Sequence, residues 1–154
     1  TKGYHHLDDA QKTAEKVVEA LSPFVDQIAI CGSIRRKVAF VGDIDIIVAG
    51  TKPGFEETLI ELEADPALVK HTFEIDGVSC DVSTVDADTW GAALMHHTGS
   101  KGENIRLRKV AKKLGKSLSQ YGLRDNATRL VGLGLTEQDT YAQLGQEYKE
   151  PEER

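Results

Sequence analysis

Two aspartates interrupt the most apolar segment of this sequence. Asp43 and Asp45 lie at the start of a run that is otherwise isoleucine and valine up to Val48. Side chains alternate between the faces of a strand, so both carboxylates point one way while Ile44 and Ile46 point into the core. Two like charges about 7 Å apart repel each other, and divalent cations are their usual partners where phosphoryl groups are transferred. The segment predicts a strand with one buried face and a cation site at its start.

A third carboxylate follows in a second apolar strand. The same alternation puts Val78, Cys80 and Val82 on the inward face and Asp81 on the opposite face. If this strand lies beside the first, all three carboxylates meet on one surface. An Asp-x-Asp pair taken alone is more simply interpreted as the cap of a strand beside a turn.

A glycine-serine turn ten residues upstream favours the functional interpretation. Gly32 and Ser33 follow a short apolar strand and precede Arg35 and Arg36. Such a turn before a short helix presents backbone N–H groups and a hydroxyl to an anion, and arginine binds phosphate oxygens through two parallel hydrogen bonds. The turn, the arginines and the carboxylates together predict a nucleoside triphosphate bound by its phosphates above two metal ions.

The remaining patterns predict a mixed sheet with helices on one side, followed by a small α+β part. Asp76-Gly77 between two apolar runs predicts a two-residue hairpin, because both turn positions need positive φ. A second hairpin is expected around Arg124-Asp125-Asn126. Apolar spacing predicts helices over residues 7–21, 55–64, 89–97 and 104–114, a helix capped by Thr136 up to residue 144, and strands over 27–31, 42–48, 69–75 and 78–85.

Length and composition bound the class of protein. The chain has 154 residues, 40% hydrophobic and 29% charged, which predicts one globular domain or one with a small annex. Cys31 and Cys80 lie in apolar runs and are expected to be buried thiols in a reducing compartment. With no signal peptide and no apolar run near the roughly 18 residues of a membrane span, we expect a cytoplasmic protein, or a nuclear one in a eukaryote or virus. Because the sequence begins at Thr1 rather than Met, we expect a piece of a longer protein.

Basic residues gather in one stretch of an acidic chain. Residues 101–129 hold nine basic and two acidic side chains, a local charge of +7, so the rest carries −13 towards the overall −6. Such asymmetry is typical of a surface that binds a polyanion. A solvated lysine-rich helix face is the alternative for this stretch taken alone.

Two groups of motifs carry a resemblance to a known family. Gly-Ser followed after a spacer by Gly-Asp-Ile-Asp resembles the signature of the nucleotidyltransferase superfamily of DNA polymerase beta. Two further segments are similar to the thumb of family X DNA polymerases: HHTGSKGENIRLRKVAKKLGKSLSQYGL and the closing TEQDTYAQLGQEYKEPEER. The resemblance covers almost the whole chain. It implies an α/β nucleotidyltransferase palm with a mixed sheet over residues 1–85 and a small α+β thumb over residues 86–154.

The resemblance also implies a role for each matching residue. The three aspartates, Asp43, Asp45 and Asp81, would hold two Mg²⁺ ions, with Mn²⁺ as a substitute, and Asp81 would help to activate the primer 3′-hydroxyl. The residues implied to bind the incoming nucleotide are Gly32, Ser33, Arg36, Gly42, His96, Gly99, Ser100 and Asn104. The residues implied to contact DNA are Arg108, Lys109, Lys112 and Lys113.

The implied function is metal-dependent addition of deoxynucleotides to a primer on primer-template or gapped DNA, in short-gap repair, by a monomer that has no membrane partner. Two alternatives stay open: a small template-independent nucleotidyltransferase acting on RNA or protein, and a non-catalytic DNA-binding remnant. Two departures from the family pattern matter. His96-His97 stands where many members carry Tyr-Phe to screen the sugar 2′-hydroxyl, which implies weaker rejection of ribonucleotides, and Val41 replaces a serine that binds triphosphate in some members.

Overall fold

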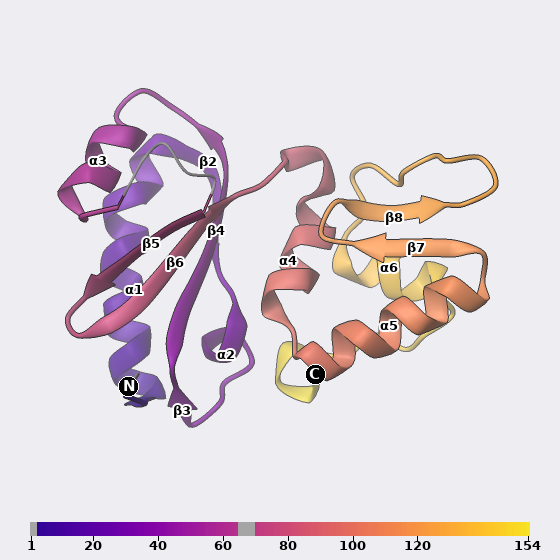
Figure 1. The fold of residues 1–154 in the computed structure, drawn as a ribbon, viewed down its shortest axis with the longest axis horizontal. Coiled ribbons are helices and arrows are strands. Elements are labelled where there is room, and N and C mark those ends of the chain that lie inside the picture. The colour runs from indigo at the N-terminus through magenta and orange to yellow at the C-terminus, as the bar shows by residue number, and fades with distance from the viewer. Residues whose placement is uncertain (1–2, 65–69) are drawn as a thin grey trace.

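The computed structural model describes residues 3–64 and 70–154. An α/β part from the N-terminal half lies beside a smaller part from the C-terminal half, and one linker after β6 leads from the first to the second (Figure 1). The elements of the first part are β1 (His5–His6), α1 (Leu7–Leu21), a 3₁₀ turn (Ser22–Phe24), β2 (Val25–Ile30), α2 (Gly32–Arg35), β3 (Phe40–Val41), β4 (Asp43–Thr51), α3 (Phe55–Glu61), β5 (Lys70–Ile75) and β6 (Val78–Thr84). The elements of the second part are a 3₁₀ turn (Ala87–Thr89), α4 (Trp90–Thr98), α5 (Lys101–Lys113), β7 (Lys116–Ser119), β8 (Gly122–Asp125), α6 (Glu137–Gln143) and a 3₁₀ turn (Pro151–Glu153).

A four-stranded mixed sheet is the frame of the first part. Its strand order is β2-β4-β6-β5, with β4 antiparallel to β2 and parallel to β6, and β5 antiparallel to β6. The β5–β6 hairpin turns at Asp76 and Gly77, whose φ angles are 51° and 75°. The structure therefore confirms the predicted two-residue turn.

The predicted alternation of β4 and β6 is also confirmed. Helices α1 and α3 lie together on one side of the sheet (Figure 1), and the side chains that pack into that core from the two central strands include Ile44, Ile46, Val48, Val78, Cys80 and Val82. The opposite face is covered at one end, where Ile47 of β4 packs with Cys31 and with Ala93 of α4. The aspartates lie on this second face, beyond the part that α4 covers.

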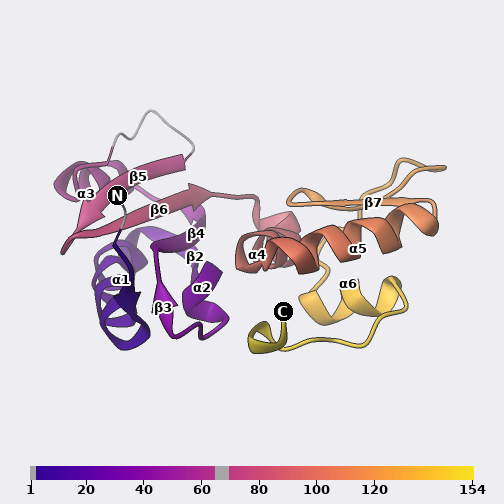
Figure 2. The same ribbon diagram turned by 60° about the horizontal axis from the view of Figure 1, so that its bottom comes forward.

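The second part has a small core of its own. Helices α4, α5 and α6 and the β7–β8 hairpin enclose six buried apolar residues: Met95, Leu107, Ala111, Leu123, Tyr141 and Leu144. The chain passes from α4 to α5 through a cis peptide bond between Gly99 and Ser100. Figure 2 shows α6 and the C-terminal segment on the side of α4 and α5 away from the β7–β8 hairpin. Helix α6 begins as predicted at Thr136, which forms a capping box with Asp139.

Several predicted boundaries differ from the observed ones. The β7–β8 hairpin was not predicted; it turns at Gln120 and Tyr121, where the Ser119 hydroxyl accepts a hydrogen bond from the Tyr121 N–H. The reversal expected around Arg124-Asp125-Asn126 is present after β8, where the Asp125 N–H donates to the Leu130 carbonyl oxygen over 2.9 Å and Arg124 bridges Val131. Helix α5 begins three residues earlier than expected because Ser100 caps it, and residue 69 of the predicted strand lies outside the described residues.

The class of fold is as predicted, a mixed sheet with flanking helices followed by a small α+β part. The short β1–β3 ribbon, antiparallel and only two residues long in each strand, had no signal in the sequence. In the described ranges, no helix has the length and apolar character needed to cross a membrane.

Candidate active site

The three predicted carboxylates lie on one face at the centre of the sheet. Asp45 on β4 is directly opposite Asp81 on β6 in the parallel pair, and Asp43 stands two residues earlier, opposite Ser79. Since side chains two apart share a face, all three aspartates project from the face that α1 and α3 leave uncovered. The structure thus places the three predicted aspartates on one face of the sheet.

Mutual repulsion is visible at Asp45. Burial, followed by the charges of Asp81 and Asp43, raises the pKa of the Asp45 carboxyl to about 6. Lys70 and Arg36 act in the opposite direction but do not offset the first three causes. A carboxylate in this position is stabilised by any cation that binds between it and its neighbours.

Asp81 is held by the adjacent strand β5. Its Oδ1 accepts a hydrogen bond of 2.7 Å from the Thr72 hydroxyl, and its Oδ2 lies 3.5 Å from the Lys70 Nζ. Within the described ranges, no group of three or more His, Cys, Asp or Glu side chains is gathered closely enough to hold a metal ion. The bonds of Asp81 to Thr72 and Lys70 are one physical reason. The donor set itself, carboxylate oxygens with an unrelieved repulsion at Asp45, suits a hard divalent cation such as Mg²⁺.

The predicted glycine-serine turn lies against this carboxylate group. Gly32 begins α2 with φ +59°, and a Cβ at this position would collide with the Asp45 carboxylate. The Cys31 N–H donates to the Asp45 carbonyl oxygen over 2.7 Å, which fixes the turn to β4. Only glycine permits both the left-handed backbone and this close approach.

Arg36 joins the turn to the start of the second part. Its Nη1 donates to the Thr98 carbonyl oxygen over 2.6 Å and its Nη2 to the Ser33 hydroxyl over 3.5 Å, with the guanidinium against Gly99. The cis peptide bond implied at Gly99-Ser100 is present. Four predicted nucleotide-binding residues therefore meet at one place, and Gly42 lies beside the carboxylates as the residue before Asp43.

Arg35 does not lie free beside the turn as the sequence suggested. Its two Nη atoms bind both carboxylate oxygens of Glu137, at 2.8 and 2.5 Å, and Nη1 also donates to the Thr98 hydroxyl. Arg154 donates to the same carboxylate from the other side, at 2.7 Å. In this structure Arg35 fastens α2 to α4 and α6, and its guanidinium is directed away from the place proposed for a phosphate.

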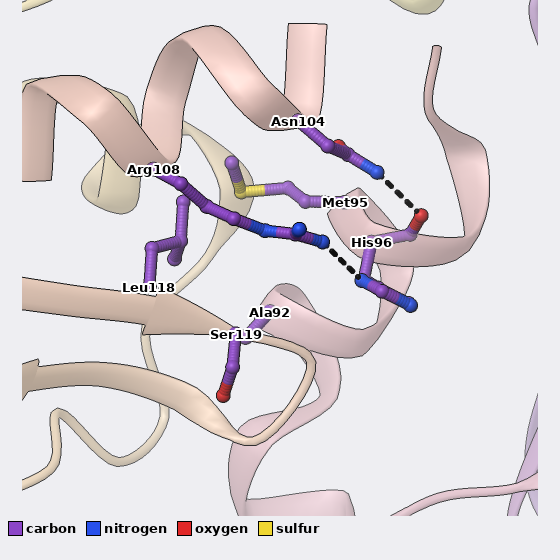
Figure 3. Close-up of a pocket in the computed structure, with 7 residues that line it drawn as sticks. All are labelled: Ala92, Met95, His96, Asn104, Arg108, Leu118 and Ser119. Atoms are coloured by element: carbon purple, nitrogen blue, oxygen red, sulfur yellow. Dashed lines mark hydrogen bonds between the residues drawn. The ribbon is translucent and has the colours of Figure 1, made fainter. Parts of the chain in front are cut away.

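Three residues with implied nucleotide or DNA contacts, His96, Asn104 and Arg108, gather between α4 and α5 (Figure 3). The Asn104 amide donates to the His96 carbonyl oxygen over 2.9 Å, and the Arg108 Nη2 lies 3.4 Å from the His96 Nδ1. Burial, then the charge of Arg108, lowers the pKa of His96. Lys109, Lys112 and Lys113 lie farther along α5 and are exposed, outside this cluster.

A cleft of about 470 Å³ adjoins the carboxylates. It lies between the end of β6 and the tip of the β7–β8 hairpin, and its walls include Lys70, Ser83, His96, His97, Gln120 and Tyr121. Lys70 borders both the cleft and Asp81, so a ligand in the cleft is within reach of the carboxylate group. Tyr121 is 70% exposed at this edge, a position suited to contact with a base or sugar.

Sequence reasoning missed the partners that hold the site. Thr72 and Lys70 were foreseeable, since the two-residue turn at Asp76-Gly77 fixes the register and puts Thr72 opposite Asp81. Glu137 and Arg154 were not foreseeable: Glu137 binds Arg35 across about a hundred residues of chain, Arg154 binds Glu137, and no local pattern marks either residue.

Comparisons with known proteins point to one family. A family model described as "DNA polymerase beta thumb" matches residues 93–154. The chain is 31% identical over 157 residues to the DNA polymerase/3′-5′ exonuclease PolX of Bacillus subtilis, covering 94% of this chain and 27% of that protein. It is 31% identical over 141 residues to the Repair DNA polymerase X of African swine fever virus (isolate Tick/Malawi/Lil 20-1/1983), covering 82% and 80%.

The fold is similar to that of a solved relative. Polymerase beta of Leishmania infantum, in a ternary P/T complex, superposes with a TM-score of 0.78 at 23% identity, covering 99% of this chain and 77% of that one. The chain spans just over a quarter of the bacterial relative and four-fifths of the viral one.

Proposed function

The chain belongs to the family X DNA polymerases, and on that premise we propose that it is a palm-and-thumb core, residues 1–85 and 86–154, that extends a DNA primer. Its substrates would be deoxynucleoside triphosphates and primer-template or gapped DNA, and its role short-gap repair synthesis. The observation that carries the proposal is the register of β4 and β6, which puts Asp45 opposite Asp81 with Asp43 on the same face.

Asp43, Asp45 and Asp81 are the residues we propose to hold two Mg²⁺ ions, with Mn²⁺ as a substitute. When bound, the ions neutralise the triphosphate and the charge that develops during in-line displacement. Asp81 lies on the side of the cleft, where it would receive the primer end and help to activate its 3′-hydroxyl. Lys70 lies 3.5 Å from the Asp81 Oδ2, so cation binding at this carboxylate would compete with Lys70.

The incoming nucleotide would bind between the turn and the α4–α5 junction. Ser33, Arg36 and the backbones of Gly32 and Gly42 would hold the phosphates, because they present N–H, hydroxyl and guanidinium donors beside the carboxylates. Gly99-Ser100 would lie against the sugar.

We further propose that His96 screens the sugar 2′-hydroxyl and that Asn104 and Arg108 meet the nascent base pair. Asn104 and Arg108 are one helical turn apart on α5 and so face the same side. Farther along the same helix, three lysines would contact the DNA backbone: Lys109, Lys112 and Lys113.

Primer extension on gapped DNA in Mg²⁺ tests the proposal, with Asp45→Asn compared against Asp26→Asn. Asp26 is an exposed β2 residue that pairs with Lys52, so its substitution removes the same charge away from the site. We expect Asp45→Asn to abolish incorporation and Asp26→Asn to leave it unchanged. Turnover without a template would favour the template-independent nucleotidyltransferase. DNA binding without any turnover in the unmodified chain would favour the non-catalytic remnant.

A further inference from the structure

One residue, His96, binds both side chains that are proposed to check the base pair. Its carbonyl oxygen accepts from the Asn104 amide at 2.9 Å, and its Nδ1 lies 3.4 Å from the Arg108 Nη2. His96 is in the last turn of α4, whose final carbonyls lack partners within the helix. Asn104 therefore acts as a side-chain cap for α4, while Arg108, one turn later on α5, reaches the ring of the same histidine (Figure 3).

The space between these residues is small. Ala92, Met95, Leu118 and Ser119 complete its lining, and the cavity measures about 10 Å³, room for no more than one water molecule. The Asn104 amide and one Nη of Arg108 are bound to His96, so these donors can bind a nucleobase only after the contacts open. His96 also lines the adjoining cleft of about 470 Å³, so it borders both spaces.

Arg108 is held weakly by comparison with its neighbour Arg106. Arg106 pairs with the buried carboxylate of Glu103 at 2.7 Å and also binds Gln146, which fixes it to the thumb core. For Arg108 the partner is a neutral ring: a guanidinium only donates, so Nδ1 must be the acceptor and the ring proton lies on Nε2. A half-exposed hydrogen bond of this kind is easily exchanged for one to DNA.

We propose that His96 is a positioning residue that stores Asn104 and Arg108 in the DNA-free protein and releases them together when primer-template DNA enters the cleft. The proposal deepens the proposed function and rests on it for the DNA half; the storage contact itself does not depend on polymerase activity. Release exchanges hydrogen bonds within the protein for hydrogen bonds to the nascent pair. The Asn104 and Arg108 side chains therefore become free to bind only when a DNA duplex enters the cleft.

Protonation of the His96 ring gives a way to open this contact without DNA. A protonated Nδ1 donates rather than accepts and repels Arg108. Among the described residues, the other charged or titratable groups around His96 are His97, whose ring is 5.1 Å away edge-on, and Lys70, Asp86 and Tyr121, which line the same cleft. Burial and Arg108 lower the pKa of His96, so the change is expected below the ordinary histidine value of about 6.5.

The first test is ¹⁵N NMR of the DNA-free chain from pH 8 to pH 5, following the arginine Nε and histidine ring nitrogens. We expect the Arg108 Nε resonance to move with the same midpoint as the His96 ring, and the Arg106 Nε to stay unchanged as an internal control. In His97→Phe the shared transition should persist, and in His96→Phe the Arg108 signal should lose its pH dependence. An Arg108 signal that ignores the His96 titration in the unmodified chain overturns the storage contact.

The second test measures binding of gapped DNA at pH 8. His96→Phe removes the acceptor but keeps a flat ring, so it should tighten binding by about two- to fivefold, the range of an exposed charged contact. In an Arg108→Ala background the same substitution should have no effect, because the ring contact is already lost and Asn104 still binds the main-chain carbonyl of residue 96. With Arg108 intact, a His96→Phe variant that binds gapped DNA no more tightly than the unmodified chain contradicts the proposal. Absence of DNA binding in every variant, with the NMR result intact, contradicts the proposed function instead.

Discussion

The Asp45 carboxylate lies between two other carboxylates, with Gly32 packed against it, and its pKa is raised to about 6. In an unfolded chain the pKa of an aspartate carboxyl is about 3.9. The folded chain therefore takes up a proton at Asp45 at a higher pH than the unfolded chain does. Above pH 6 the ionised Asp45 carboxylate lowers the free energy of unfolding by its full amount. This destabilisation decreases as the pH falls through 6 and is gone below about pH 4.

Asp45→Asn should accordingly stabilise the metal-free protein at pH 8. The free energy of unfolding should rise by about 1–3 kcal/mol, because each unit of pKa corresponds to about 1.4 kcal/mol. This increase should shrink towards zero between pH 6 and pH 4. Thermal unfolding in the presence of a chelator measures it. Added Mg²⁺ should then raise the Tm of the unmodified protein more than that of the variant.

Asp26→Asn supplies the control for this experiment. Its side chain is exposed and pairs with an exposed lysine, so a change within about 0.5 kcal/mol is expected at every pH. An Asp45→Asn protein that is no more stable than the unmodified one at pH 8 would show that the three carboxylates do not repel each other as described.

At the scale of elements, a buried group of charges joins α2, α4, α6 and the C-terminal segment. Glu137 is 5% exposed and binds Arg35 and Arg154, and the Arg154 guanidinium lies 5.5 and 5.3 Å from the ring centres of Tyr141 and Tyr148. Burial works against the charge of Glu137, but the hydrogen bonds from the two arginines outweigh it and lower its pKa. This group connects α2 of the first part to α4, α6 and the C-terminal segment of the second.

Glu137→Gln should destabilise the protein by about 3 kcal/mol at pH 7, because it leaves the buried Arg154 and the partly buried Arg35 guanidinium groups without a compensating charge. Because folding lowers the pKa of Glu137, this stabilisation is fully present above the pKa of an unfolded glutamate, about 4.3. It is lost as the pH falls through the pKa of Glu137 in the folded chain. The difference between variant and unmodified protein should therefore narrow in acid. Urea unfolding at pH 7 and pH 3.5 measures both.

A matched substitution at the same junction isolates the effect of burial. Glu152→Gln removes an exposed carboxylate 3.9 Å from Lys37 and should cost no more than about 0.5 kcal/mol. Equal effects of Glu137→Gln and Glu152→Gln would contradict the idea that the buried group joins the two parts.

Elements also show what the sequence could predict and what it could not. The face of each aspartate followed from alternation along β4 and β6, and the β5–β6 turn followed from Asp76-Gly77, since both are local properties of the chain. The parallel register that puts Asp45 opposite Asp81 depends on packing across the whole sheet. The hairpin at Gln120-Tyr121 was missed because neither residue is typical of tight turns, and the Arg35–Glu137 pairing has no local signal at all.

At the scale of the whole molecule, the charge is divided between the two parts. Residues 101–129 carry +7 within a chain of net charge −6, and Lys109, Lys112 and Lys113 are exposed on α5. DNA binding through α5 must overcome the repulsion between DNA and the acidic rest of the chain. Because each phosphate that binds a lysine or arginine releases counterions, binding should weaken steeply as salt rises, and extension should be distributive.

Replacing Lys109, Lys112 and Lys113 by alanine should reduce the slope of log K against log salt by about one for every phosphate that these lysines bind. The metal requirement should not change, since these side chains lie away from the carboxylates. A control with Lys12, Lys16 and Lys52 replaced changes the net charge equally on the palm and should leave the slope nearly intact. Binding that is tight and insensitive to salt would show that other parts of the chain hold the DNA.

The measurement that tests the central claim most directly is single-turnover incorporation on gapped DNA with each of the four template bases in turn. If Asp43, Asp45 and Asp81 supply the chemistry while Asn104 and Arg108 meet the nascent pair, the preferred deoxynucleotide should change with the template base and be its complement each time. Alanine at both α5 positions should erode that preference while incorporation still requires Mg²⁺. A preference that ignores the template base, or incorporation that persists in Asp45→Asn, would contradict the account.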